Sequence, residues 1–152
     1  LAGLEDTKLE GRRMLDVGTG SGVLAIAASR LGVTSLVAVD IDAVAIENAR
    51  LNLHVNLGEE HVSQRVILQQ GSAKDAGDEP FDVIVANIES HILLPMVPDL
   101  LQRLGKGGCI IFSGLLRREE RTFIDGLIES GLTIDGRWQR DDWFSCRAYV
   151  VD

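Results

Sequence analysis

The stretch Leu15-Asp-Val-Gly-Thr-Gly-Ser-Gly-Val23 decides the fold of this chain. It joins a short apolar segment to three alternate glycines, Gly18, Gly20 and Gly22, and an apolar run with helical spacing follows directly. Glycine permits positive φ angles and lets a ligand touch bare backbone. The first turn of a helix offers unpaired N–H groups and a partial positive charge to an anion. The stretch therefore predicts a strand, a glycine loop and a helix that together hold a nucleotide-type cofactor.

The spacing of the glycines separates two classes of cofactor site. The dinucleotide pattern G-x-G-x-x-G places its third glycine three residues after the second. Here Val23 occupies that position and the third glycine is Gly22, while an acidic residue, Asp16, stands two residues before the first glycine. The resulting D-x-G-x-G-x-G resembles motif I of the class I S-adenosylmethionine (SAM) methyltransferases. This resemblance implies that the cofactor is SAM rather than a nicotinamide dinucleotide.

Predicted strands and helices alternate along the rest of the chain. Apolar runs predict strands at residues 13–17, 35–40, 66–70, 81–86, 109–113, 132–140 and 143–151. Helical spacing predicts helices at residues 21–31, 43–57, 91–104 and 117–130. Repeated β-α units form a parallel sheet with helices on both faces, and the last two strands, with no helix between them, must form an antiparallel hairpin. We therefore expect a three-layer, Rossmann-like α/β fold, for which the class I methyltransferase topology implies a mostly parallel seven-stranded sheet of order 3-2-1-4-5-7-6.

Composition narrows the function classes. The chain has 152 residues, 45% of them hydrophobic, which predicts one domain covering residues 1–152. Its net charge of −8 argues against direct binding of nucleic acid, which needs clustered Lys and Arg. Cys109 and Cys146 have no metal or redox spacing and are interpreted as reduced core thiols. Without a signal peptide or a membrane-length apolar stretch, we expect a cytoplasmic protein, a monomer rather than an oligomer, with no metal requirement.

Ligands of open parallel sheets bind at the carboxyl ends of the strands, and the glycine loop is the first segment predicted there. Its backbone amides, around Gly18, Thr19, Gly20 and Gly22, would receive the methionine carboxylate of SAM. Asp16 would either accept a hydrogen bond from the methionine amino group or shape the turn by bonding to loop amides. Both interpretations keep Asp16 at the site.

The second segment follows the second predicted strand. Asp40 ends this strand twenty residues after Gly20, where a carboxylate can accept hydrogen bonds from both ribose hydroxyls. Asp42 is the alternative ribose ligand, although it is better placed to cap the following helix. Ile41 would pack on the adenine face.

Two further segments complete the candidate site. Ser72 and Ala73, after the third strand, would meet the adenine edge, by backbone as much as by side chain, unless they form an ordinary loop. Asn87 ends the fourth strand, where its amide oxygen can hold an incoming amine in line with the S–CH₃ bond, so Asn87 is the predicted catalytic residue. The alternative is that Asn87 caps the helix that begins near Ser90. His91 is expected to be a solvated residue of that helix's first turn.

The two tryptophans belong to the final hairpin. Trp138 and Trp143 are expected to pack on it, although Trp143 has an alternative role at the mouth of a substrate site.

Longer stretches of the chain resemble the ribosomal protein L11 methyltransferase family (PrmA). They are L-D-V-G-T-G-S-G-V-L-A-I-A-A-S-R-L at 15–31, V-D-I-D-A-V-A-I-E-N at 39–48, D-V-I-V-A-N-I at 82–88, I-F-S-G-L-L at 111–116 and D-D-W at 141–143. The combination of A-N-I with S-G-L-L is the most specific of these features. The N-P-P-Y of methyltransferases that act on glutamine or adenine is absent, because Asn87 is followed by Ile88 and Glu89.

The resemblance implies a function and a partner. The family transfers methyl groups from SAM to amino groups of lysines and of the N-terminus of a ribosomal protein, so the expected substrate is a protein such as ribosomal protein L11. The family's separate N-terminal substrate-recognition domain does not precede Leu1 in this sequence. Two other classes stay open: a small-molecule methyltransferase on the same core, and a non-catalytic SAM-binding domain or a dinucleotide enzyme such as a reductase.

Overall fold

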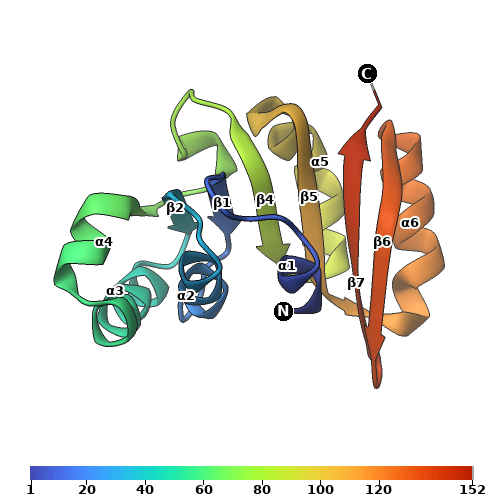
Figure 1. The fold of residues 1–152 in the computed structure, drawn as a ribbon. Coiled ribbons are helices and arrows are strands. Elements are labelled where there is room, and N and C mark those ends of the chain that lie inside the picture. The colour runs from blue at the N-terminus through green and yellow to red at the C-terminus, as the bar shows by residue number, and fades with distance from the viewer. Residues whose placement is uncertain (152) are drawn as a thin grey trace.

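A seven-stranded sheet with helices on both faces forms the molecule in the computed structural model, which describes residues 1–151 (Figure 1). The strands are β1 (Arg13–Val17), β2 (Ser35–Asp40), β3 (Val66–Gln70), β4 (Phe81–Asn87), β5 (Leu104–Leu116), β6 (Leu132–Arg140) and β7 (Trp143–Val150). The helices are α1 (Ala2–Glu5), α2 (Val23–Arg30), α3 (Ala43–Leu57), α4 (Glu59–Arg65), α5 (Ser90–Arg103) and α6 (Glu120–Glu129), with 3₁₀ turns η1 (Ala73–Asp75) and η2 (Arg117–Glu119).

The strand order is β3-β2-β1-β4-β5-β7-β6, which confirms the predicted topology. The strands β3, β2, β1, β4 and β5 pair in parallel, and β7 pairs antiparallel with both β5 and β6. Strand order reverses between β1 and β4, where Val17 pairs with Ala86. The segments that follow β1, β2 and β4 therefore meet at one edge of the sheet, where open α/β sheets bind their ligands.

Each face of the sheet has its own apolar core. On one face α5 and α6 cover a cluster in which Phe123 makes edge contacts with Phe112 and Phe144, at ring-centroid distances of 5.5 and 6.2 Å. On the other face α1, α2 and α3 cover a second cluster that includes Met14 and Leu53. Because the central strands are buried on both sides, their sequences are apolar almost without interruption.

Two elements differ most from the predicted pattern. The helix α4 was not predicted, because Val62 is its one buried residue and seven residues with a single apolar contact carry no periodicity. β5 extends beyond the predicted residues 109–113 at both ends. Gly107 and Gly108, expected as a turn, lie within this strand, in an irregular part where the register with β4 shifts.

Neither cysteine forms a disulfide bond. Cys146 is buried in the core, and burial raises the pKa of its thiol to about 12, so the thiol stays protonated. Cys109 is half-buried, and burial raises the pKa of its thiol as well. Between residues 1 and 151 there is no helix with both the length and the apolarity needed to cross a membrane.

Candidate active site

The glycine loop connects β1 to α2 and has three left-handed residues. Gly18, Gly20 and Gly22 have φ angles of 69°, 55° and 81°, a region that side chains rarely adopt. A Cβ atom at Gly18 would lie 2.8 Å from Cδ1 of Ile88, so the loop passes directly against the segment that follows β4. A Cβ at Gly20 would have no atom within 4 Å. Gly20 therefore faces open space, and this space is available to a ligand.

Most amides of the glycine loop already donate hydrogen bonds within the protein. Those of Gly18 and Thr19 both donate to the carbonyl of Val39, at 2.9 and 3.0 Å. The amide of Gly20 donates to Oδ2 of Asp40 at 3.0 Å, and that of Gly22 donates to the Thr19 carbonyl at 2.8 Å. The bonds to Val39 and Asp40 attach the loop to β2, and the bond between Gly22 and Thr19 closes the loop on itself. Each of the four amides that were expected to bind the methionine carboxylate therefore already has a hydrogen-bond acceptor within the protein, and that acceptor competes with the ligand.

Asp16 lies beneath the loop rather than on its surface. Its side chain is fully buried, and Oδ2 accepts a hydrogen bond of 2.7 Å from the hydroxyl of Thr19. Its other oxygen, Oδ1, has no partner among the described residues. Burial raises the pKa of this carboxyl from 3.8 to about 6, against the opposing effect of the Thr19 hydrogen bond. In this conformation Asp16 supports the turn, but it does so through the hydroxyl of Thr19 and not through the loop amides that were expected.

Asp40 connects the two loops that flank the site. Oδ2 accepts from the amide of Gly20 and Oδ1 accepts from the amide of Asp42, each at 3.0 Å. The residue is half-buried, so the remaining lone pairs of both oxygens can still accept from two neighbouring hydroxyls. Asp42 instead caps α3, since its Oδ1 accepts from the Val44 amide at 2.8 Å, which confirms the expected cap. Ile41, between them, is 78% exposed.

Ser72 and Ala73 are held by a local hydrogen-bond network. The amide and the hydroxyl of Ser72 both donate to Oδ2 of Asp75 at 2.8 Å, and the hydroxyl accepts from the Lys74 amide. The side chain of Ala73 is buried in the core. The Ser72 side chain caps η1 and the Ala73 side chain faces inward, so neither side chain is free to contact adenine. A ligand would meet this segment through its backbone.

Asn87 ends β4 and is exposed at the sheet edge, paired in register with Ser113 of β5. It does not cap α5, because the N-cap residue of that helix is Glu89, so the alternative role predicted for Asn87 is wrong. A Cβ atom at Gly114, whose φ is 75°, would lie 2.7 Å from Oδ1 of Asn87. Because Gly114 has no side chain, the side chain of Asn87 can occupy this space. The sequence contained this signal in its S-G-L-L stretch, but no role was predicted for the glycine.

A cavity of about 470 Å³ lies in front of Asn87. It is lined by Asn87, Ile88, Glu89, Ser113, Gly114 and Trp143. Trp143 lines this cavity and is 54% exposed, which is compatible with its alternative role at the mouth of a substrate site; that role stays a prediction. Trp138 packs on the hairpin, with its ring N–H donating to Asp6 at 2.6 Å. His91 is exposed in the first turn of α5, as predicted.

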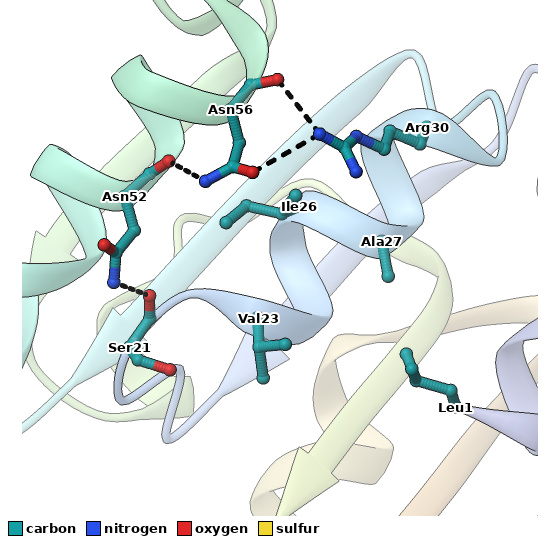
Figure 2. Close-up of a pocket in the computed structure, with 8 residues that line it drawn as sticks. All are labelled: Leu1, Ser21, Val23, Ile26, Ala27, Arg30, Asn52 and Asn56. Carbon is teal, nitrogen blue, oxygen red and sulfur yellow. Dashed lines mark hydrogen bonds between the residues drawn. The ribbon is translucent and has the colours of Figure 1, made fainter.

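A second cavity, of about 420 Å³, lies between α2 and α3 and contains none of the predicted site residues (Figure 2). Its polar side chains bond to one another and to the backbone. Nδ2 of Asn52 donates to the carbonyl of Ser21 at 2.9 Å, and Arg30 donates to Asn56 at 3.3 Å (Figure 2). Asn52 therefore ties the glycine loop to α3. Sequence reasoning missed this contact, because it joins residues 31 positions apart.

The sequence of the chain is similar to proteins of one family. The family model of ribosomal protein L11 methyltransferase (PrmA) matches residues 1–150. The ribosomal protein L11 methyltransferase of Anoxybacillus flavithermus is 40% identical over 140 residues, and that of Geobacillus kaustophilus is 40% identical over 143 residues. These matches cover 92% and 94% of this chain but 44% and 45% of the relatives. The chain thus spans less than half the length of these curated relatives.

Solved structures have the same fold. A ribosomal protein L11 methylase from Lactobacillus delbrueckii subsp. bulgaricus superposes with a TM-score of 0.86 at 33% identity, over 98% of this chain and 75% of that one. The magnesium protoporphyrin IX methyltransferase of Synechocystis, solved with bound SAM, has a TM-score of 0.76 at 18% identity, over 99% of this chain and 76% of that one. The second likeness is one of fold alone. On the family match and the first two relatives, the chain belongs to the ribosomal protein L11 methyltransferase (PrmA) family.

Proposed function

We propose that this chain is the SAM-binding, methyl-transferring domain of a protein that methylates amino groups of ribosomal protein L11. The observation that carries the proposal is the meeting of three segments at one edge of the sheet. The glycine loop contacts Ile88 through Gly18, Asp40 holds the Gly20 amide, and Asn87 opens into a cavity beside them. Family membership supports the same activity.

The residues at this edge fit SAM. The carboxylate of Asp40 has lone pairs for the two ribose hydroxyls, and the exposed side chain of Ile41 offers an apolar surface to adenine. The backbone at Ser72 and Ala73 would meet the adenine edge. The open side of Gly20 and the N-terminal end of α2 suit the methionine portion, whose carboxylate favours a helix N-terminus. Asp16 would act indirectly, by holding Thr19 and the loop.

The chemistry requires positioning more than acid–base catalysis. When bound, SAM supplies a methyl group on a positively charged sulfur, which departs with the electrons of the broken C–S bond. The acceptor must present a neutral nitrogen, so an ammonium group first gives its proton to solvent. Oδ1 of Asn87 would accept an N–H of this amine and turn its lone pair toward the methyl carbon.

The domain would act as a monomer, as part of a longer protein, in the cytoplasm. The described residues, 1–151, share one sheet, and all proposed site residues come from a single copy of the chain, so one domain and a monomer suffice. Relatives of more than twice this length have room for a further part that selects the substrate. A ribosomal protein is synthesised and assembled in the cytoplasm, which is where we place this activity.

Titration calorimetry with SAM and NAD side by side tests the cofactor. We expect heat of binding with SAM and none with NAD. Transfer of labelled methyl from SAM to ribosomal protein L11, compared with a panel of small amines, then tests the acceptor. Binding of NAD in place of SAM would overturn the proposal, and methylation of small amines but not of L11 would favour a small-molecule methyltransferase.

A further inference from the structure

The mouth of the cavity in front of Asn87 combines an anion with an aromatic ring. Of the six residues that line it, Glu89 is the one with a charged side chain. Trp143 lines the same cavity with more than half of its side chain exposed. A carboxylate beside an exposed indole is the combination that binds organic cations, because the ring face attracts positive charge as well.

The carboxylate of Glu89 has no structural task that would keep it from a ligand. Glu89 is the N-cap residue of α5, but its side chain makes no capping hydrogen bond. Its side chain is 77% exposed, and its ion-pair partner is Nδ1 of His91 at 3.4 Å, in a side chain that is 70% exposed. Exposed pairs of this kind are weak, because water screens both groups. An incoming cation can therefore compete for Glu89.

Glu89 sets the sign of the charge at the cavity mouth, because the other charged residues beside the cavity cancel one another. The neighbouring hairpin tip contains Arg140, Asp141 and Asp142, and Arg117 reaches it by donating to the Asp141 carbonyl at 3.3 Å. These two cations and two anions balance one another. Arg140 pairs across the strands with Trp143, and the two residues line a separate cavity on the hairpin, but Arg140 does not line the cavity in front of Asn87. Glu89 thus makes the α5 side of the mouth negative.

We propose that Glu89, together with the ring of Trp143, selects acceptors that arrive as ammonium ions, such as a lysine side chain. This inference rests on the proposed function and adds a determinant of acceptor choice to it. Glu89 pairs with the cation, the indole covers its apolar stem, and Asn87 lies at the inner end. Because the ammonium form cannot attack, Glu89 contributes to capture of the acceptor and not to the methyl-transfer step. Neutral amides and ring amines gain nothing from it.

Equilibrium binding of two peptides tests this selection without turnover. One is a short peptide with blocked ends and a single lysine, and the other is the same peptide with an ε-N-acetylated lysine. We expect the wild-type chain to bind the lysine peptide about three- to fivefold more tightly, as for one exposed charge pair. Glu89→Gln should remove this preference, Glu89→Asp should keep it, and added salt should weaken it in the wild type only.

Glu129→Gln is the matched control, because it removes the same charge from an exposed position at the end of α6. It should leave the preference intact. With SAM and L11, Glu89→Gln should raise KM by about the same factor, while the Kd for SAM stays unchanged. Equal binding of both peptides by the wild type, or a preference that survives in Glu89→Gln, would overturn the inference and leave the proposed function standing. Absence of SAM binding by the wild type would instead count against the proposed function.

Discussion

At the residue scale, Asp16 and Asp40 stand near the ends of adjacent strands in opposite surroundings. Asp40 is half-buried and accepts two backbone amides, whereas Asp16 is fully buried with one hydroxyl as its partner. Both were predicted at the site from their spacing to the glycines. Their accessibility could not be predicted, because it depends on how Thr19 folds over Asp16. The same spacing thus yields one carboxylate open to a ligand and one that supports the loop.

Replacing Asp40 tests its proposed contact with ribose. We expect Asp40→Ala to raise the Kd for SAM by about tenfold or more, since hydrogen bonds to a charged group contribute about 1.5–3 kcal/mol. Calorimetry measures this change. Asp42→Ala is the control: it removes the α3 cap, which costs about 1 kcal/mol of stability, and should leave SAM affinity near the wild-type value. Equal affinity in Asp40→Ala would reject the ribose contact.

The raised pKa of Asp16 predicts a dependence of stability on pH. Burial raises this pKa from 3.8 to about 6, so the native state binds the proton more tightly than the unfolded state does. The stability contributed by Asp16 is then complete below the unfolded value and is lost as the pH rises through the folded one. Relative to Asp16→Asn, the wild type should lose up to about 3 kcal/mol of unfolding free energy between about pH 4 and about pH 7. Urea unfolding of both proteins measures this difference, and a constant difference would contradict it.

At the scale of elements, the limits of every strand except β5 followed from the sequence to within one residue. β1, β2 and β3 have the predicted limits, and β4 is one residue longer. β1, β2 and β4 are largely buried, and their runs are apolar because helices cover both faces of the sheet there. β5 extends through Gly114 to Leu116, past its buried core segment. Its last residues pair with β7, and such long-range pairing leaves no periodic signal in the strand itself.

The end of β5 should control the conformation of Asn87. In Gly114→Ala, the new Cβ would lie 2.7 Å from Oδ1 of Asn87, so we expect methyl transfer to fall by at least about tenfold, as for a misplaced positioning group. SAM affinity should change less. Gly107→Ala is the matched control, since its φ of 72° is similar but its Cβ would meet nothing within 4 Å. Equal loss of activity in both variants would point to backbone strain and not to Asn87.

At the scale of the whole molecule, the first helix packs against the last two strands. The N-terminal helix α1 lies against the final hairpin (Figure 1). Arg147 of β7 makes a bidentate contact with Asp135 and also donates to the carbonyl of Asp6 and the hydroxyl of Thr7. The ring N–H of Trp138 donates to the Asp6 carboxylate. These bonds attach the first helix to the last two strands.

Removing this attachment should loosen the N-terminal segment. We expect Arg147→Ala to lower the free energy of unfolding by about 1 kcal/mol, because water partly screens its pair with Asp135, whose side chain is 38% exposed. Amide hydrogen exchange should increase in residues 2–9, while SAM affinity stays unchanged because Arg147 does not line the cavity in front of Asn87. Exchange spread evenly over the chain would show instead a global loss of stability.

The sequence by itself determined the order of strands and helices, the position of the glycine loop and the segments that meet at the sheet edge. Apolar periodicity and glycine spacing are local, and they constrain the backbone whatever surrounds it. Only the tertiary structure decided that Asp16 is enclosed, that the loop amides are shared with β2, and that Trp143 and Glu89 border the cavity in front of Asn87. Burial, hydrogen-bond competition and the approach of residues distant in sequence arise when the sheet assembles, so no stretch of the chain encodes them alone.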